Sequence, residues 1–241
     1  MTVTTTAPSM SIAMIHTVAG LVPTLDALAR RELPGCEPFN ILDESLLRNT
    51  IREGSLSKTT MRRLAQYVWS AVDGGAGAVV VTCSSLGPAV EAARPLCPVP
   101  LFRIDEGMAL EAVSRASRIG VLATLPTTLK PTGDIIRTSA DDTGRTRCQI
   151  TEMLCEGAFE RLSRGDREGH DALVIEGFRR LAPNVDVVVL AQASMANALA
   201  PLGSEPEGIP VLTSPELGMR HVRDRLFAGD APMRLPVSPL S

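Results

Sequence analysis

The sequence predicts an α/β protein built from two similar lobes, each a short parallel sheet flanked by helices. Short β-branched runs such as 78–81 (Ala-Val-Val-Val) are typical of strands buried on both faces. These runs alternate with longer amphipathic segments such as 57–73, which is the order of strand–helix–strand units. The same order then occurs a second time along the chain. We therefore expect two α/β lobes related by a pseudo-two-fold axis.

The internal repeat rests on two pairs of strands. The run 119–124 (Ile-Gly-Val-Leu-Ala-Thr) resembles 12–17 (Ile-Ala-Met-Ile-His-Thr), and both end in threonine. The run 188–195 resembles 79–86 at nearly the same offset along the chain. Nearly equal offsets indicate internal self-similarity. The expected organisation is a disordered tail over 1–9, an N-terminal lobe over 10–112, a C-terminal lobe over 113–226 and a second tail over 227–241.

The first lobe is expected to hold four strands and four helices. Its strands are short apolar runs, and its first helix carries Leu25, Leu28 and Ala29 on one face. The expected strands cover 11–17, 38–43, 78–83 and 99–104, and the expected helices cover 23–32, 57–73, 87–93 and 106–116.

The helix over 57–73 shows the clearest start and end signals. Ser57 is a candidate N-cap, and a glycine-rich stretch follows the last helical residue. Leu64, Val68 and Trp69 are expected to be buried on its apolar face.

The second lobe is less regular in sequence. Pro126, Pro131 and Gly133 predict a loop over 125–145 that contains a strand at 134–138 and could cover a cleft. The expected strands are 119–124, 134–138, 188–191 and 209–212, and the expected helices are 149–162, 167–181 and 215–226.

Composition excludes several classes of function. The chain has 241 residues, 44% of them hydrophobic, and a net charge of −3, without the basic clusters of a nucleic-acid surface. No apolar segment approaches membrane-spanning length, and the first residues do not form a signal peptide. The five scattered cysteines match neither a disulfide framework nor a zinc site, which favours a cytoplasmic protein with reduced thiols and no metal. They are Cys36, Cys83, Cys97, Cys148 and Cys155.

Cys83 lies where the strand over 78–83 leads into a helix. In an open α/β sheet this is the carboxyl edge, where ligands bind. The backbone N–H groups of Ser84, Ser85 and Leu86 would point at the same place, favour the thiolate and hold a substrate carboxylate. The alternative is a buried cysteine in an ordinary turn between strand and helix.

Two motifs on the repeated lobes resemble the aspartate/glutamate racemase superfamily. Val-Thr-Cys-Ser-Ser at 81–85 looks like its first catalytic cysteine motif, and Leu-Ala-Gln-Ala-Ser-Met at 190–195 is similar to the second motif of hydantoin racemases. The superfamily also includes maleate isomerases and arylmalonate decarboxylases. The resemblance covers about residues 11–224 and implies a two-lobed fold, a small carboxylate substrate and no cofactor; homo-oligomers are common in the superfamily, and the sequence leaves the oligomeric state open.

The chain departs from the family at Gln192, where the resemblance implies the second cysteine. Two opposed thiols can racemise a carbon beside a carboxylate, but a glutamine amide neither takes nor gives a proton at a usable pKa. Cys83 alone would still support cis–trans isomerisation, or protonation of an enolate after loss of carbon dioxide. The decarboxylase branch, however, retains the cysteine of the other lobe. A catalytically lapsed protein that binds a carboxylate is the third interpretation.

The expected site therefore has Cys83 as its thiol and Gln192 as an amide that orients the substrate. His16 is a candidate second proton donor, or else a hydrogen-bonding histidine at a strand end. Asp43, Glu44 and Ser45 either reach the cleft or cap a helix. The residues expected to bind substrate are His16, Thr17, Ser84, Ser85, Thr124, Thr127, Thr128, Ala193 and Ser194, the two hydroxyls at 127 and 128 being implied by the resemblance.

Overall fold

The first half of the chain forms a four-stranded parallel sheet in the order β2-β1-β3-β4. The computed structural model describes residues 10–203 and 205–227, so the predicted tails lie outside or at the limit of the described residues. The strands are β1 (Met10–His16), β2 (Cys36–Leu42), β3 (Ala78–Val81) and β4 (Leu101–Arg103). The helices between them are α1 (Val22–Glu32), α2 (Glu44–Glu53), α3 (Lys58–Asp73) and α4 (Gly87–Ala93).

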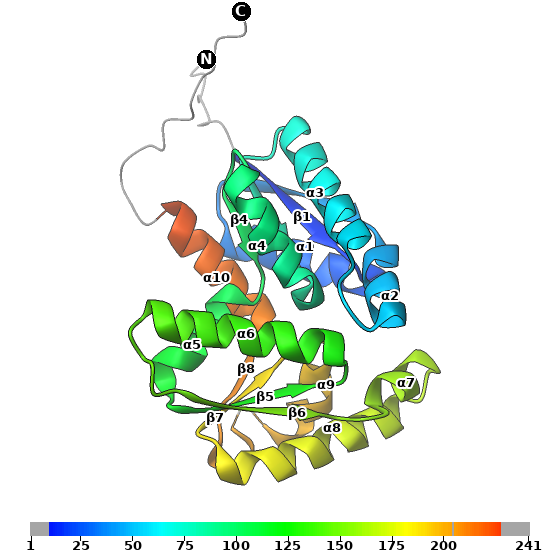
Figure 1. Cartoon of the computed structure of the whole chain (residues 1–241), viewed down its shortest axis with the longest axis vertical. Helices are drawn as coiled ribbons and strands as arrows, with labels where there is room; N and C mark the ends of the chain where they lie inside the picture. The colour runs from blue at the N-terminus through cyan, green and yellow to red at the C-terminus, as the bar shows by residue number, and fades with distance from the viewer. Residues whose placement is uncertain (1–9, 204, 228–241) are drawn as a thin grey trace, which may run out of the picture.

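The second half repeats this arrangement in the order β6-β5-β7-β8 (Figure 1). Its strands are β5 (Arg118–Ala123), β6 (Gln149–Leu154), β7 (Val187–Leu190) and β8 (Val211–Thr213). Its helices are α6 (Pro126–Asp142), α7 (Ala158–Ser163), α8 (Arg167–Leu181) and α9 (Met195–Leu199). The expected fold class, two similar α/β lobes with parallel sheets, is confirmed.

Strand register confirms the internal repeat residue by residue. In the first sheet Ile15 pairs with Val81, and in the second Leu122 pairs with Leu190. The sequence repeat aligns Ile15 with Leu122 and Val81 with Leu190, which are the same two pairs. The ends of β3 and β7 therefore occupy equivalent places in the two sheets.

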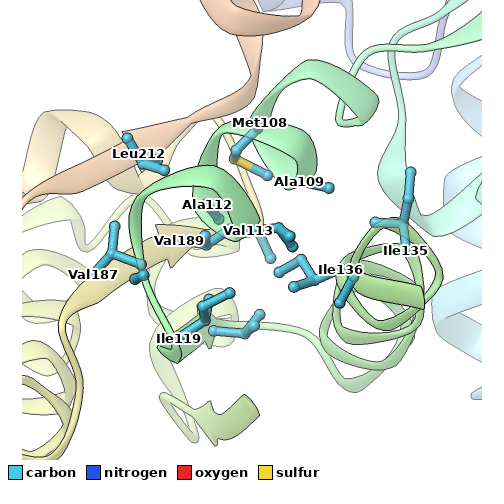
Figure 2. Close-up of a cluster of buried hydrophobic side chains, with 14 of the residues drawn as sticks. Met108, Ala109, Ala112, Val113, Ile119, Ile135, Ile136, Val187, Val189 and Leu212 are labelled. Atoms are coloured by element: carbon cyan, nitrogen blue, oxygen red, sulfur yellow. The ribbon is translucent and has the colours of Figure 1, made fainter. Parts of the chain in front are cut away.

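Two helices carry the chain between the lobes. Helix α5 (Glu106–Arg115) packs Met108, Ala109, Ala112 and Val113 against the second sheet (Figure 2). The last helix, α10 (Ser214–Phe227), follows the second sheet but packs Met219 and Val222 against the first. Helices α5 and α10 also lie side by side, which ties the two lobes together (Figure 1).

The expected loop over 125–145 is wrong, because residues 126–142 form helix α6. Pro126 occupies the first helical turn, where its missing N–H costs no hydrogen bond. Pro131 lies inside the helix and removes one backbone hydrogen bond. Burial of Ile135 and Ile136 against the second sheet outweighs that loss. The predicted strand at 134–138 is therefore absent, and the helix lies between the lobes.

Two further expectations are wrong. The segment 149–162 is not one helix, since β6 pairs with β5 over 149–154 and only α7 is helical. Tertiary pairing at a sheet edge overrides the local preference of its Thr-Glu-Met-Leu run. Trp69 is 47% exposed rather than buried, whereas Leu64 and Val68 are buried as expected. Within the described part of the chain, no helix combines the length and the apolar character needed to cross a membrane.

The contact of α10 with the chain just before α5 predicts a strong effect of adding one methyl group. A β-carbon at Gly218 would overlap the backbone carbonyl oxygen of Ile104, which cannot move aside as a side chain can. We expect Gly218→Ala to lower the free energy of unfolding by about 1–3 kcal/mol, measured by urea denaturation. Gly20→Ala, where no atom lies within 4 Å of the added carbon, is the control. Equal stability of both variants would contradict the close packing of α10.

Candidate active site

Cys83 lies at the carboxyl edge of the first sheet, just after the end of β3. Its backbone is still extended (φ −125°, ψ 109°), and the chain then turns through the 3₁₀ segment Ser84–Leu86 into α4. Its side chain is partly buried, beside the Thr17 hydroxyl and the backbone N–H groups of Ser85 and Leu86. The sulfur therefore occupies the expected position between a strand end and a ring of neutral donors.

The electrostatics of Cys83 differ from the expected thiolate. Burial is the largest influence and raises the pKa of the thiol, and the negative charge of Asp105 acts in the same direction. Donors at Thr17, Ser85 and Leu86 lower the pKa but do not compensate. The following helical segments are only three and seven residues long, so their dipole contributes little. Burial therefore favours the neutral thiol over the thiolate.

The turn after Cys83 contacts the second lobe directly. The hydroxyls of Ser85 and Thr128 are hydrogen-bonded at 2.8 Å, and both residues are buried. Thr128 lies in the first turn of α6, which begins just after β5. A second link joins the first lobe to α6, because Arg103 at the end of β4 donates from Nη2 to the carbonyl oxygen of Pro131 at 3.3 Å. The structure thus brings together predicted site residues from both lobes.

Gln192 is held by Thr124 through two hydrogen bonds. The Thr124 backbone N–H donates to Oε1 at 2.7 Å, and Nε2 donates to the Thr124 hydroxyl at 2.8 Å. Because a backbone N–H can only donate, the Gln192 atom that it contacts must be the amide oxygen. Both residues follow adjacent strands, β7 and β5, at the carboxyl edge of the second sheet. Gln192 is thus a rigid amide at the place equivalent to Cys83.

His16 is engaged at both ring nitrogens. Nε2 lies 2.8 Å from Oδ1 of Asn40, whose amide nitrogen donates to Asp26, so Nε2 carries the proton. Nδ1 lies 3.0 Å from the Thr82 hydroxyl. Burial lowers the pKa of His16, which keeps the ring neutral. These contacts join the ends of β1, β2 and β3, so His16 matches the expected alternative of a hydrogen-bonding histidine at a strand end. Its partners Asn40 and Thr82 were not among the expected site residues.

The remaining predicted residues fall at the same two strand ends. The Thr127 hydroxyl oxygen is buried and has no hydrogen-bond partner among the described residues. Ser84 is buried in the first turn, while Ala193 and Ser194 lie in the equivalent turn before α9 and are partly buried. Asp43 caps α2 through Ser45 and binds Arg63 and Tyr67, which is the structural alternative for that segment.

A groove of about 810 Å³ lies elsewhere, between α4, α5, α6 and α10. Arg94, Phe102, Glu106, Ile135 and His221 help to line it, and none of the predicted site residues does. Over residues 10–203 and 205–227, no cluster of three or more histidine, cysteine or acidic side chains is arranged to hold a metal ion.

The sequence profile of one family, described as Asp/Glu/Hydantoin racemase, matches residues 12–222. The chain belongs to this family. The matched residues include Cys83 and Gln192, which follow β3 and β7, and the contact between Ser85 and Thr128. No curated protein matches the sequence at a significant level.

Solved structures share the family fold with this chain. A glutamate racemase from Bacillus anthracis is 16% identical, with a TM-score of 0.70 over 91% of this chain and 82% of its own. The allantoin racemase from Klebsiella pneumoniae is 19% identical, with a TM-score of 0.62 over 97% and 96%. An arylmalonate decarboxylase is 16% identical, with a TM-score of 0.52 over 92% and 94%.

The lowered pKa of His16 predicts a pH dependence of stability. Because the folded state holds the ring neutral, the unfolded state binds more protons below its pKa of about 6.5. Stability should therefore be complete above that pH and fall as the pH decreases from about 7 to 5. Urea denaturation across this range should show a smaller loss for His16→Gln than for the wild type. A free energy of unfolding that depends on pH as steeply in His16→Gln as in the wild type would contradict the neutral, buried ring.

Proposed function

We propose that the protein is a cofactor-independent isomerase or racemase that acts on a small carboxylate, with Cys83 as its base or nucleophile. The observation that carries the proposal is the position of this thiol, between a strand end and neutral donors, beside a buried contact with the other lobe. Hydroxyl and N–H donors fixed in a buried site stabilise negative charge as it develops on a bound carboxylate.

The first turn of α6 supports a carboxylate at this place. Helix α6 is 17 residues long, and its amino end follows β5 at the carboxyl edge. The buried Thr127 hydroxyl lacks a partner, although buried polar groups are nearly always hydrogen-bonded. A substrate carboxylate would accept from Thr127 and from the positive end of the helix dipole. Thr128 and Ser85 would hold the two lobes around it.

The chemistry follows from one thiol and one carboxylate. In its deprotonated form, Cys83 would remove a proton from the carbon beside the carboxylate, leaving an enolate whose charge the neutral donors hold, and the thiol formed in this way would return the proton to the substrate. Two of the fold relatives are named for racemising glutamate and allantoin, each with a hydrogen on carbon beside a carbonyl group. Gln192 carries no proton; fixed by Thr124, it would orient the substrate.

Decarboxylation is the second candidate, because a lone thiol can protonate the enolate left when carbon dioxide departs. The resemblance implies a second cysteine where this chain has Gln192, so the single remaining thiol favours this candidate, as does the fold shared with an arylmalonate decarboxylase. A carboxylate-binding protein without turnover is the third, although it would need no thiol at position 83.

Removal of the thiol tests the proposal. Cys83→Ala should lower turnover about 10³-fold or more, since no other described group replaces the sulfur at that place, and Cys83→Ser should retain a trace. Circular dichroism and thermal melting serve as controls for folding. Full activity of the folded alanine variant would exclude every mechanism that uses this thiol.

Solvent isotope exchange separates the candidates. Both enantiomers of glutamate, aspartate, allantoin and 5-substituted hydantoins, together with arylmalonates, would be incubated in deuterated water and followed by nuclear magnetic resonance. Deuterium at the carbon beside the carbonyl, without carbon loss, is expected for an isomerase or racemase. Release of carbon dioxide would establish the lyase. Tight calorimetric binding without any chemical change would identify a binding protein.

Gln192 should act on binding more than on the chemical step. Gln192→Ala removes two hydrogen bonds to Thr124, and we expect KM to rise about tenfold, equivalent to about 1.4 kcal/mol, with kcat reduced much less than in Cys83→Ala. A loss of kcat as large as that of the thiol variant would contradict the orienting role.

A further inference from the structure

The groove beside His221 runs between the lobes, along the outer edge of the first sheet. Strand β4 is the last strand of that sheet, and its residues 101–103 line the groove from the first lobe. Helix α6 lines it from the second lobe, where Ile135 is buried in the wall (Figure 1). A volume of about 810 Å³ is within the range of small-molecule sites.

Two arginines of this groove are held rigidly, and both present Nη1 to the same carboxylate. Arg94 donates from Nε to the backbone of β4 at 3.0 Å and from Nη2 to Glu106. Arg103 donates from Nε and Nη2 to the two oxygens of Asp105 at 2.9 and 2.8 Å. Nη1 of Arg94 lies 3.0 Å from one oxygen of Glu91, and Nη1 of Arg103 lies 3.6 Å from the other. The two guanidinium groups therefore form a place for one carboxylate.

Glu91 occupies this place loosely. Its side chain is 47% exposed, and its distance from Arg103 is too long for a hydrogen bond. The Arg103 side chain is only 6% exposed, so its charge is poorly hydrated and gains more from a close anion than a surface charge does. An exposed glutamate can turn into solvent at small cost. An anion inside the groove could then approach both arginines closely.

The two acidic residues that α6 contributes to the groove lie away from this pair of arginines or are already paired. Asp134 is bound by two cationic side chains of its own helix. Asp142 lies about 16 Å along the helix axis from Pro131, whose carbonyl oxygen accepts a hydrogen bond from Arg103. Neither carboxylate therefore competes with an anion at the arginines.

Helix α10 adds a further cation to the groove. Arg225 lines the groove and forms no ion pair with the acidic side chains that the structure describes. Burial lowers the pKa of His221, and the charges of Arg225 and Arg94 act in the same direction, against that of Asp224. The field at the His221 ring is thus set more by cations than by anions, which favours an anionic ligand.

Apolar side chains beside the arginines define the rest of the ligand. Phe102 precedes Arg103 on β4, and His221 packs edge-on against its ring at a centroid distance of 6.3 Å. Ile135 lies one turn beyond Pro131 on α6. Phe102 and Ile135 both line the groove. A flat apolar group attached to the anion would therefore contact both lobes.

We propose that the groove is an effector site for a small organic anion, namely a carboxylate or phosphate group on a flat apolar ring, held by Arg94 and Arg103. The ligand displaces Glu91, bridges β4 and α6, and in this way controls access to Cys83. The site is separate from the strand ends where substrate is proposed to bind, and it does not depend on the proposed function.

Arg103 connects the groove to the turn after Cys83. Its guanidinium packs against Gly87, where an added β-carbon would lie 2.3 Å from Cζ. Gly87 directly follows the Ser84–Leu86 segment, which provides N–H groups beside the thiol. Nη2 of the same side chain reaches Pro131 in the other lobe. A ligand that fixes this guanidinium and bridges the lobes should therefore slow the access of reagents to Cys83.

Calorimetry with 1-naphthoate and 1-naphthyl phosphate tests the site. 1-Naphthamide is the uncharged control, and inorganic phosphate is the control without a ring. 1-Naphthoate has no hydrogen on the carbon beside its carboxylate, so it cannot be a substrate of the proposed reaction. We expect the two naphthyl anions to bind about tenfold more tightly than either control. The tighter of the two identifies the anionic group that the arginines prefer.

Variants of the groove should change this affinity in opposite directions. Glu91→Gln removes the competing carboxylate and should tighten binding about threefold, whereas Arg94→Gln should weaken it about tenfold. Thr138→Trp, at an exposed position of α6 that lines the groove, should block binding without changing any charge. Arg118→Gln is the matched control, because this exposed arginine pairs with Asp186 in a separate groove.

The reaction of Cys83 with iodoacetamide, followed by mass spectrometry of its peptide, measures the coupling without any turnover. Saturating 1-naphthoate should slow this alkylation about fivefold in the wild type and leave it unchanged in Thr138→Trp. Thr127→Val, which alters the strand ends and not the groove, should keep the wild-type affinity for 1-naphthoate.

Three results would overturn the proposal. They are no binding of either naphthyl anion, equal affinity in the wild type, Arg94→Gln and Thr138→Trp, and a loss of affinity in Thr127→Val alone, which would put the ligand at the strand ends. Binding in the groove with an unchanged rate of alkylation would overturn the control of access to Cys83. All of these measurements are made without turnover, so failure of the proposed function would be seen separately, in the deuterium exchange.

Discussion

The site depends on one buried contact between the lobes, the hydrogen bond between Ser85 and Thr128. Each hydroxyl belongs to a turn that leaves a central strand, so the bond fixes the carboxyl edge of one sheet against that of the other. The Arg103 guanidinium, paired with buried Asp105, reinforces this contact by reaching the Pro131 carbonyl. The donors beside Cys83 come from the first lobe, whereas Thr127 and Thr128, in the first turn of α6, come from the second.

Burial at the strand ends of the first sheet also determines the chemistry. It raises the pKa of Cys83 and lowers that of His16, which favours the neutral form of both groups. A site of neutral donors favours a substrate that brings its own negative charge, because that charge meets no competing anion among the groups that bind it. Gln192 fits this setting, since an amide pinned by Thr124 adds polarity without adding charge.

Much of the fold could be predicted because strands that are buried on both faces keep an apolar pattern in each copy of the repeat. Ile15 pairs with Val81 in the first sheet, and Leu122 pairs with Leu190 at the equivalent place in the second. Helix α6 could not be predicted, because its prolines and glycine argue locally for a loop, and only packing against the second sheet makes it a helix. The position of Cys83 at the carboxyl edge could be predicted because the residue directly follows a buried strand.

The central claim is that a small carboxylate binds at the contact between the strand ends, within reach of the Cys83 sulfur. A crystal structure of the Cys83→Ala variant with a bound small dicarboxylate tests it most directly. We predict carboxylate oxygens within hydrogen-bonding distance of Thr127 and of the Ser85 and Leu86 N–H groups, with the substrate carbon facing residue 83. A dicarboxylate bound only in the groove beside His221, with the strand ends packed and empty, would contradict the account.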